Sequence, residues 1–216
     1  MKPIKISNRN IMFTQPMTDE YDLNLGLILG DRHNFIIDTG LGSGSVAPIL
    51  DYIGDCTKPI IVINTHSHWD HVWGNWVFDE NLIISHQKCH ELLDKYWELP
   101  LEKYSHYIDG EAHKCLPNQI FEGILGFPDD GIILFHTPGH TDDGISILDT
   151  VDKVLYAGDN IGDTDDEIVP KLTDLEAFRG TIAAYKKLDF EICISGHNKP
   201  QNKSVLARIE AEGNLD

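Results

Sequence analysis

The residues best suited to chemistry lie in the segment T-H-S-H-W-D-H at positions 65–71. Within seven positions it holds three histidines and one aspartate: His66, His68, Asp70 and His71. Imidazole and carboxylate groups are the ligands that suit zinc and its first-row neighbours. The segment follows an apolar run at 59–63, which is typical of a buried strand. An extended chain points His66 and His68 the same way, and a helix that begins near Asp70 turns that aspartate and His71 toward the same pocket. The segment therefore predicts a metal site, with more ligands than one tetrahedral zinc usually takes from one segment.

Three later segments repeat a pattern in which an apolar strand ends near a glycine and a potential metal ligand. The ligands that follow the apolar runs at 132–135, 154–157 and 192–195 are His140, Asp159 and His197. In α/β proteins, binding sites gather at the carboxyl ends of strands, where glycine lets the backbone turn sharply. We therefore expect seven side chains to converge at one edge of a sheet: His66, His68, Asp70, His71, His140, Asp159 and His197.

The other histidines lack this context. Those predicted to be packed or solvated are His33, His86, His90, His106 and His113. His136 precedes a Thr-Pro-Gly turn and is expected to face away from the site. A lone histidine of this kind is common, whereas an accidental cluster like that at 65–71 is rare.

The order and spacing of the motifs resemble those of the metallo-beta-lactamase superfamily, from Asp22 to about His197. The motifs are H-x-H-x-D-H at 66–71, T-P-G-H-T at 137–141, G-D at 158–159 and G-H at 196–197. The resemblance implies an αββα sandwich, an α/β fold in which two β-then-α modules hold metals at a shared sheet edge. It also implies two metal sites that Asp159 would bridge. Their other ligands would be His66, His68 and His140 in the first site and Asp70, His71 and His197 in the second.

Asp38, in the segment I-I-D-T-G, matches an aspartate that in this superfamily supports the metal ligands without binding the metal. Metal-bound histidines usually pass their other N–H to a carboxylate or carbonyl group, so a nearby buried aspartate would have this role. A second interpretation is that Asp38 caps the turn before Gly40. Both remain open at the level of sequence.

No linker divides the chain, so residues 1–216 are expected to form one domain. The first module is predicted to contain strands at 4–14, 23–29, 34–38, 59–64 and 82–85, helices at 45–52 and 87–97, and a short helix after Asp70. The second is predicted to contain strands at 132–136, 145–149, 154–157 and 192–195 and helices at 174–188 and 201–213.

Residues 98–130 join the modules and do not fit the minimal fold. Their aromatic residues are Tyr104, Tyr107, Phe121 and Phe127. A connection this long is often a lid or an oligomer contact, and a passive connector is an equally open interpretation. The loop at 15–24, with Met17 and Tyr21, corresponds to a hairpin that flanks the substrate in the superfamily.

The composition is strongly acidic, with 35 Asp and Glu residues against 17 Lys and Arg and a formal net charge of −18. Long-range repulsion therefore disfavours nucleic acids and anionic membrane surfaces as partners. No signal peptide or membrane-spanning run is apparent. The cysteines are predicted to be small buried residues in a reducing compartment, which makes the expected location cytoplasmic. They are Cys56, Cys89, Cys115 and Cys193.

The ligand set predicts a metal-dependent hydrolase. Two metals roughly 3.5–4 Å apart would share a bridging hydroxide, which attacks the carbonyl group of a thioester, lactone or related compound. Asp70 is also expected to relay a proton. Zinc is the preferred metal, and iron or manganese accept the same ligands. Many β-lactamases of the superfamily carry a cysteine where this chain has Asp159, so the resemblance favours the thioesterase and lactonase branches.

Two alternatives remain open. A mononuclear iron dioxygenase of the same superfamily, acting on persulfides, would use only part of the ligand set. A non-catalytic metal-binding domain is disfavoured, because structural zinc sites typically have four ligands.

The acidic segment at 163–167 borders the active-site mouth in related proteins. Its carboxylates are Asp163, Asp165, Asp166 and Glu167, and the nearby cations are Lys171 and Lys199. Such a rim would repel anions, so the predicted substrate is a small neutral or cationic molecule. A solvated turn is the competing interpretation. A homo-oligomer is compatible with the chain.

Overall fold

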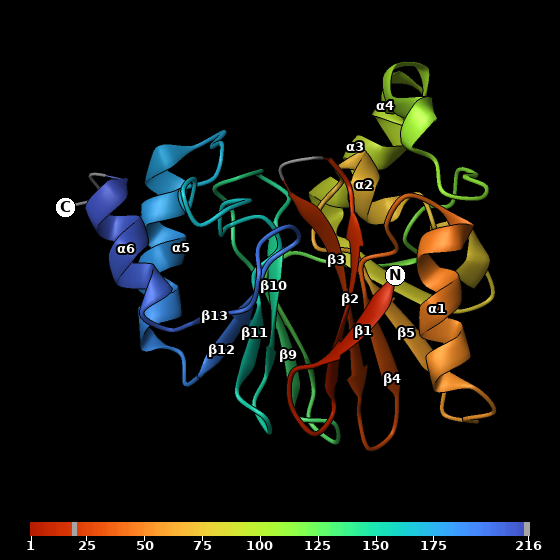
Figure 1. Ribbon diagram of the computed structural model, residues 1–216, viewed down its shortest axis with the longest axis horizontal. Coiled ribbons are helices and arrows are strands. Elements are labelled where there is room, and N and C mark those ends of the chain that lie inside the picture. The colour runs from red at the N-terminus through yellow and green to blue at the C-terminus, as the bar shows by residue number, and fades with distance from the viewer. Residues whose placement is uncertain (19–20, 214–216) are drawn as a thin grey trace.

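The chain forms a layered sandwich in which two β-sheets pack face to face and helices cover the outer faces (Figure 1). The computed structural model describes residues 1–18 and 21–213. Helices α1 (Ser43–Ile53) and α3 (Gln87–Tyr96) lie outside the first sheet, and α5 (Leu175–Lys187) and α6 (Val205–Glu212) lie outside the second. The predicted αββα architecture is confirmed.

The first sheet has the order β1-β2-β3-β4-β5-β6-β7 and the second the order β13-β12-β11-β10-β9-β8. The strands of the first sheet are β1 (Lys2–Lys5), β2 (Asn10–Pro16), β3 (Asp22–Leu29), β4 (Asn34–Ile37), β5 (Ile60–Ile63), β6 (Leu82–His86) and β7 (Gln119–Phe121). The strands of the second sheet are β8 (Ile124–Phe127), β9 (Ile132–His136), β10 (Ile145–Asp149), β11 (Val154–Tyr156), β12 (Ile192–Ile194) and β13 (Gln201–Asn202). The remaining helical segments are α2 (Trp69–Val72), α4 (Glu98–Tyr104) and the 3-10 turns η1 (Asn75–Phe78) and η2 (Ser105–Tyr107).

Strand β5 is apolar at every position, rather than at alternate ones, because both of its faces are covered. Ile61 and Ile63 belong to the core between the two sheets, which also contains Leu134. Val62 belongs to the core under α1, which also contains Val46. Because both faces of the strand are covered, Ile61, Val62 and Ile63 are buried, and Ile60 at its start is partly exposed. The burial continues through Asn64 and Thr65, the two residues between β5 and His66.

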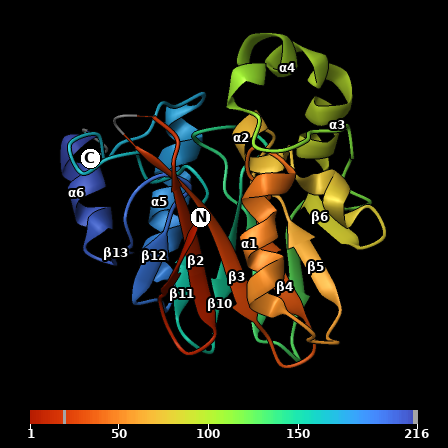
Figure 2. The same cartoon turned by 45° about the vertical axis from the view of Figure 1, so that its right-hand side comes forward.

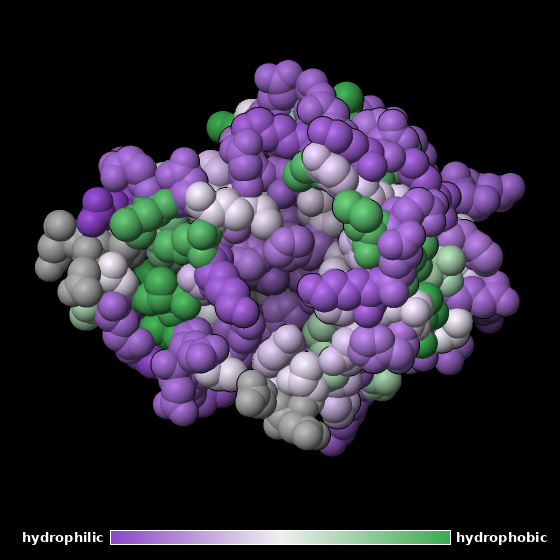
Figure 3. Space-filling view, turned by 90° about the horizontal axis from the view of Figure 1, so that it is seen from above, coloured by the Kyte–Doolittle hydropathy of each residue, from purple (hydrophilic) through white to green (hydrophobic). Residues whose placement is uncertain are grey.

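Parallel pairing brings the ends of several strands to one edge. Strands β4, β5 and β6 pair in parallel in the first sheet, and β11 and β12 pair in parallel in the second. The segments that follow these strands therefore emerge together, at the upper edge in Figure 1. Figure 3 looks onto this edge, where hydrophilic residues surround a central hollow.

The expected single strand at 4–14 is wrong, because β1 and β2 form an antiparallel hairpin. The hydroxyl of Ser7 accepts a hydrogen bond from the backbone N–H of Asn10 and donates one to Asp152 at 2.6 Å. This local bond turns the chain in the way that serine and asparagine favour. The turn is thereby attached to the opposite sheet.

The expected helix at 201–213 begins later than predicted. Residues 201–202 form the short strand β13, which pairs with β12, and helix α6 begins at Val205. The side chain of Asn202 accepts a hydrogen bond from the backbone N–H of Ser204. Asparagine thus closes a turn where a helix pattern seemed continuous.

The region at 98–130 is only partly an insertion. Strands β7 and β8 lie at the edges of the two sheets, whereas α4 stands beyond them, next to α3 and α2 (Figure 2). The segment packs through Leu101 and Tyr104 against a buried cluster that includes Trp73, Leu93 and Trp97. A role as a lid or an oligomer contact stays a prediction.

Two features bear on the predicted compartment. All four cysteines are free, but the expectation that all are buried is wrong, because Cys56 is exposed and Cys115 is only partly buried. Cys56 lies in the loop between α1 and β5, outside the packed layers. No helix within residues 1–18 and 21–213 has the length and apolar character needed to cross a bilayer. The cytoplasmic location stays a prediction.

Candidate metal centre

Five chain segments carry the seven predicted ligands to the common edge of the sheets. The turn after β5 carries His66 and His68, and α2 carries Asp70 and His71. The loops after β9, β11 and β12 carry the other three: His140, Asp159 and His197. Their nitrogen and oxygen atoms fall into two groups in which all atoms lie within 4.8 Å of one another. One group is His66, His68, His140 and Asp159, and the other is Asp70, His71 and His197.

Asp159 lies between the two groups. Its Oδ2 atom is 3.6 Å from Nε2 of both His66 and His140, 3.4 Å from Nε2 of His71 and 3.3 Å from Nε2 of His197. One carboxylate oxygen therefore faces imidazoles of both groups. Glycine is required beside it, because a Cβ on Gly196 would come within 2.3 Å of Asp159 Oδ1.

The centre contains buried polar atoms that make no hydrogen bond. They are His66 Nε2, His71 Nε2 and Asp159 Oδ1. A buried polar group without a partner is costly, and nearly all such groups in proteins are satisfied. A divalent cation would supply the missing partner for these lone pairs, and the mixed nitrogen and oxygen set suits zinc, iron or manganese. The residues present therefore fit a metal.

The opposite side of four imidazole rings is already engaged. The Nδ1 contacts are His66 with Thr65 Oγ1 (3.1 Å), His71 with Asp38 Oδ2 (2.8 Å), His140 with the Lys171 carbonyl (2.8 Å) and His197 with the Asp22 carbonyl (2.9 Å). These contacts leave Nε2 directed at the centre, the arrangement that fixes a metal-binding tautomer. His68 differs, because its Nδ1 faces His140 Nε2 at 3.2 Å. Because His140 Nε2 points at the centre, His68 would bind a metal through Nδ1, unlike the other four histidines.

Asp38 holds two of the ligand segments together. It accepts hydrogen bonds from the backbone N–H and the hydroxyl of Thr65, both at 2.7 Å, as well as facing His71 Nδ1. Its φ of 61° lies in the left-handed region, where aspartate and asparagine are among the tolerated residues. Asp38 lies in the turn after β4, and its described side-chain contacts are with Thr65 and His71, as expected of a residue that orients metal ligands.

The carboxylates and histidines shift one another's pKa values strongly. Burial raises the pKa of Asp159, but the neighbouring His71 and His197 outweigh it and hold that pKa well below its ordinary value. Conversely, burial lowers the pKa of His71, and the carboxylates of Asp159 and Asp38 overcome this and raise it well above its ordinary value. Asp159 therefore remains an anion, which is the charge a cation site requires.

Sequence reasoning missed Asp143, a fully buried residue close to the centre. Its Oδ2 accepts a hydrogen bond of 2.7 Å from the backbone N–H of Ser67, between the two histidines of the first group. The bond fixes the turn that carries both ligands. The only signal in the sequence is the position of Asp143 in the motif H-T-D-D-G, before Gly144.

Aromatic residues surround the opening, and sequence reasoning named only some of them. Tyr21 contacts His197 edge to face, with ring centroids 5.2 Å apart. Trp69 stacks on Tyr104 at 4.8 Å, so α4 contacts the residue between His68 and Asp70. The loop at 15–24 therefore reaches the site through Met17 and Tyr21, which line its cavity, although residues 19–20 lie outside the described part of the chain.

The other histidines lie apart from the two groups. His136 stacks on His86, with ring centroids 4.1 Å apart, and its Nε2 contacts the Asp142 carbonyl. The remaining contacts are those of His33 with Asp130, His90 with the Pro117 carbonyl, His113 with Glu111 and His106 with Tyr107. These partners account for their positions without a metal.

Comparison with known proteins settles the family. The model of the metallo-beta-lactamase superfamily matches residues 20–197. The chain belongs to this superfamily. Among curated relatives, the acyl-coenzyme A thioesterase MBLAC2 from Gallus gallus is 27% identical over 165 residues, and that from Homo sapiens is 25% identical over 164. Each match covers 65% of this chain and 58% of the relative, so the chain aligns with about three fifths of these proteins.

Solved structures of the metallo-beta-lactamase superfamily share the fold. The enzyme TMB-1 matches with a TM-score of 0.79 at 17% identity, over 100% of this chain and 98% of its own. A metallo-beta-lactamase from Hirschia baltica matches with a TM-score of 0.75 at 17% identity, over 97% and 96%. Membership of the superfamily and the thioesterase relatives together support the prediction of a metal-dependent hydrolase.

Proposed function

We propose that this protein hydrolyses a thioester, lactone or related carbonyl compound with two divalent metals, of which zinc is the preferred one. The observation that carries the proposal is the position of Asp159, with one oxygen 3.3–3.6 Å from imidazoles of both ligand groups. A carboxylate so placed suits a pair of metals better than one. The similarity to acyl-coenzyme A thioesterases favours a thioester among the possible carbonyl substrates.

The protein's own residues have distinct parts in such a reaction. When bound, divalent metals lower the pKa of a coordinated water and polarise a carbonyl oxygen. His66, His68, His140 and Asp159 would hold one of them. Asp70, His71 and His197 would hold the other, with Asp159 shared. Asp70 Oδ2 lies 3.3 Å from His197 Nε2, and the second carboxylate oxygen of Asp70 would accept a proton and pass it on to the leaving group.

Metal content and oxygen dependence test this function directly. We expect two metals per chain by elemental analysis of metal-replete protein, and hydrolysis of simple thioesters that continues without oxygen. A chelator should abolish the activity, and zinc or manganese should restore it. A single iron per chain, together with oxygen consumption on a persulfide, would instead establish the dioxygenase alternative. Metal binding without any hydrolysis of thioesters, lactones or phosphodiesters would favour a non-catalytic metal-binding domain.

The acidic segment borders the proposed site on one side. Asp163 and Lys171 line both the cavity over the metal centre and a polar groove that continues past Asp166 and Glu167. Asp165 does not belong to this groove, because it pairs with Lys199 and accepts a hydrogen bond from Gln201. The carboxylates that line the groove therefore outnumber its cation, which supports a neutral or cationic substrate.

Neutralising the groove should change selectivity for substrate charge. The triple variant Asp163→Asn, Asp166→Asn and Glu167→Gln should raise kcat/KM for an anionic coenzyme A thioester about tenfold, relative to a neutral N-acetylcysteamine thioester, at low ionic strength. The gain should shrink near 0.15 M salt, where the screening length is about 8 Å. The matched control, Asp31→Asn, Asp55→Asn and Asp129→Asn, removes the same charge from exposed loops at the opposite ends of the strands. Equal ratios in both triple variants would mean that the acidic segment is a solvated turn without influence on substrate.

A further inference from the structure

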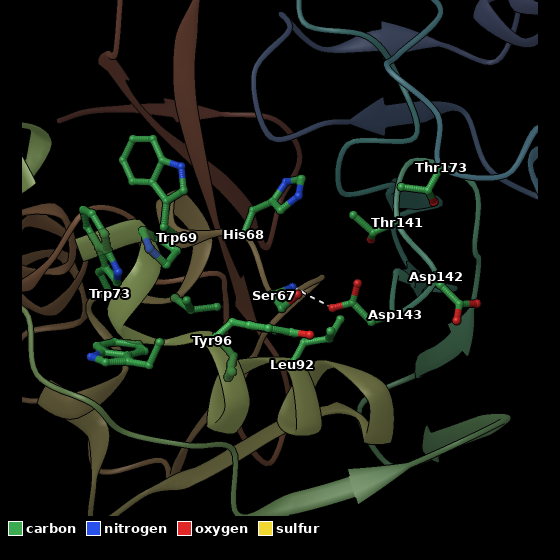
Figure 4. Close-up of a pocket in the computed structure, with 14 residues that line it drawn as sticks. Ser67, His68, Trp69, Trp73, Leu92, Tyr96, Thr141, Asp142, Asp143 and Thr173 are labelled. Carbon is green, nitrogen blue, oxygen red and sulfur yellow. Dashed lines mark hydrogen bonds between the residues drawn. The ribbon is translucent and has the colours of Figure 1, made fainter. Parts of the chain in front are cut away.

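An apolar cavity of about 390 Å³ opens beside the metal centre. Helix α3 supplies one wall through Leu92, Leu93 and Tyr96, and the indole rings of Trp69 and Trp73 form another. Figure 4 shows these rings on one side of the cavity, with Thr141 and Thr173 across from them. The volume falls within the roughly 300–1,000 Å³ that is usual for small-molecule sites.

The cavity borders the proposed site. His68 and Trp69 line this cavity and also the cavity of about 290 Å³ above the metal centre. His68 is an exposed residue that lines both cavities. A molecule whose carbonyl group lies at the metal centre can therefore extend past His68 into the apolar cavity without leaving the protein surface.

The walls favour an uncharged, apolar group. No lysine or arginine is among the described residues that line the cavity. Of its carboxylates, Asp142 pairs with Lys88, and Asp143 accepts a hydrogen bond from the Ser67 backbone through Oδ2, whereas the buried Oδ1 of Asp143 has no hydrogen-bond partner. A carboxylate or phosphate would be repelled by these like charges with no cation in the lining to offset them, whereas an alkyl or aryl group would be removed from water against tryptophan and leucine.

The polar groove lies on a different side of the centre, since it meets the metal cavity through Tyr21, Asp163 and Lys171 instead of His68 and Trp69. The centre is thus flanked by one apolar and one acidic compartment. We infer that the cavity along α3 binds the hydrophobic acyl group of the substrate, while the acidic groove receives a neutral or cationic leaving group. This inference rests on the proposed hydrolase function and adds the chemical class of both halves of the substrate.

The packing suggests a permanent cavity with a defined length. Trp73, Leu93 and Trp97 are buried and belong to the cluster that joins α2, α3 and α4. Close-packed aromatic walls change shape little, so the cavity should bury an acyl chain only up to a fixed length, beyond which further methylene groups add no contact. Selectivity should therefore rise with chain length and then level off.

Two series of compounds with increasing chain length measure binding of the alkyl group separately from catalysis. Binding is measured with thioether analogues, the S-alkyl N-acetylcysteamines from ethyl to dodecyl, which cannot be hydrolysed. Three of the four tryptophans of the chain, Trp69, Trp73 and Trp97, line the cavity, so their fluorescence reports occupancy. Turnover is measured with the matching S-acyl compounds. We expect affinity and kcat/KM to increase about two- to fourfold per methylene before levelling off.

Two tryptophan substitutions locate the effect. Leu92→Trp fills the cavity and should weaken binding of the decyl analogue about tenfold while changing the ethyl analogue less than about twofold. Leu99→Trp is the matched control, because Leu99 on α4 is 60% exposed and does not line the cavity.

The outcomes separate the cavity from the chemistry. Chain-length-dependent binding without hydrolysis would uphold the apolar site and refute the proposed function. Hydrolysis that is equal for acetyl and decanoyl thioesters, and unchanged in Leu92→Trp, would uphold the function and refute the acyl site. A change of oligomeric state in Leu92→Trp but not in Leu99→Trp, without any effect on alkyl binding, would also refute it, because the cavity would then be an interface between copies.

Discussion

Replacing Asp159 with alanine should lower kcat/KM for a thioester at least about a thousandfold and reduce the metal content below two per chain. The expected size follows from the charge stabilisation of several kcal/mol that metals provide to such reactions, at about 1.4 kcal/mol for each factor of ten. Asp159 is the residue whose oxygen faces four imidazoles from both ligand groups, so its loss affects both positions. Activity assays and elemental analysis on the same preparation measure the two effects together.

Two further variants separate the charge of Asp159 from its shape. Asp159→Asn retains the size of the side chain but removes the anion, and it should resemble Asp159→Ala. Asp159→Cys offers a thiolate, a good zinc ligand, and should retain more metal than either. Asp55→Asn, at an exposed loop before β5, controls for loss of one charge and should leave activity and metal content unchanged. Two metals per chain in Asp159→Asn would argue against a bridging role.

Asp38→Asn should weaken metal binding by about 10- to 100-fold, the range typical for residues that orient metal ligands. Asparagine tolerates the positive φ of this position, so the backbone should remain unstrained. Asp38 accepts three hydrogen bonds through two oxygens, from the Thr65 backbone, the Thr65 hydroxyl and His71 Nδ1. The single amide oxygen of asparagine cannot replace both carboxylate oxygens. The His71 ring would lose the partner that directs Nε2 at the centre.

The metal titration of Asp38→Asn should be asymmetric. The group of Asp70, His71 and His197 should lose affinity more than the group that contains His66, and excess metal should recover much of the activity. Thermal unfolding of both proteins without metal provides the control for general destabilisation. Equal loss at both positions, or a metal-free variant that is already unfolded, would show that Asp38 acts through the fold and not through His71.

The convergence of the seven predicted ligands was predictable because its signals are local. An apolar run that ends beside glycine and histidine identifies both a buried strand and the side chain that emerges from it, as at His197. The parallel pairing of the strands then brings these side chains to one edge of the fold. The supporting contacts were not predictable in the same way. The carbonyl groups of Lys171 and Asp22 orient two histidines, and a main-chain carbonyl leaves no mark on residue type.

The fold was predictable where elements are long and periodic, and less so at its margins. The edge strands β7, β8 and β13 have only two to four residues and are half-exposed, so no period is established over them. The hairpin at Ser7 was missed because hydrophobic residues continue on both sides of a four-residue turn. The cavity along α3 was missed for a different reason: tryptophan and leucine at helical spacing look the same in a sequence whether they fill a core or line an opening.

The predicted ligands come from segments that are far apart in the sequence, so a bound metal would connect distant parts of the chain. His68 and His140 face each other at 3.2 Å although 72 residues separate them, and His197 comes from a still later strand. A metal held between such residues would act as a cross-link that closes long loops of the unfolded chain, in the way a disulfide does. Folding and metal availability would then be thermodynamically linked, with about 2.7 kcal/mol of added stability at a free metal concentration one hundred times the dissociation constant. The metal would then add a cross-link to the packed core and the Ser7–Asp152 hydrogen bond that already join the two sheets.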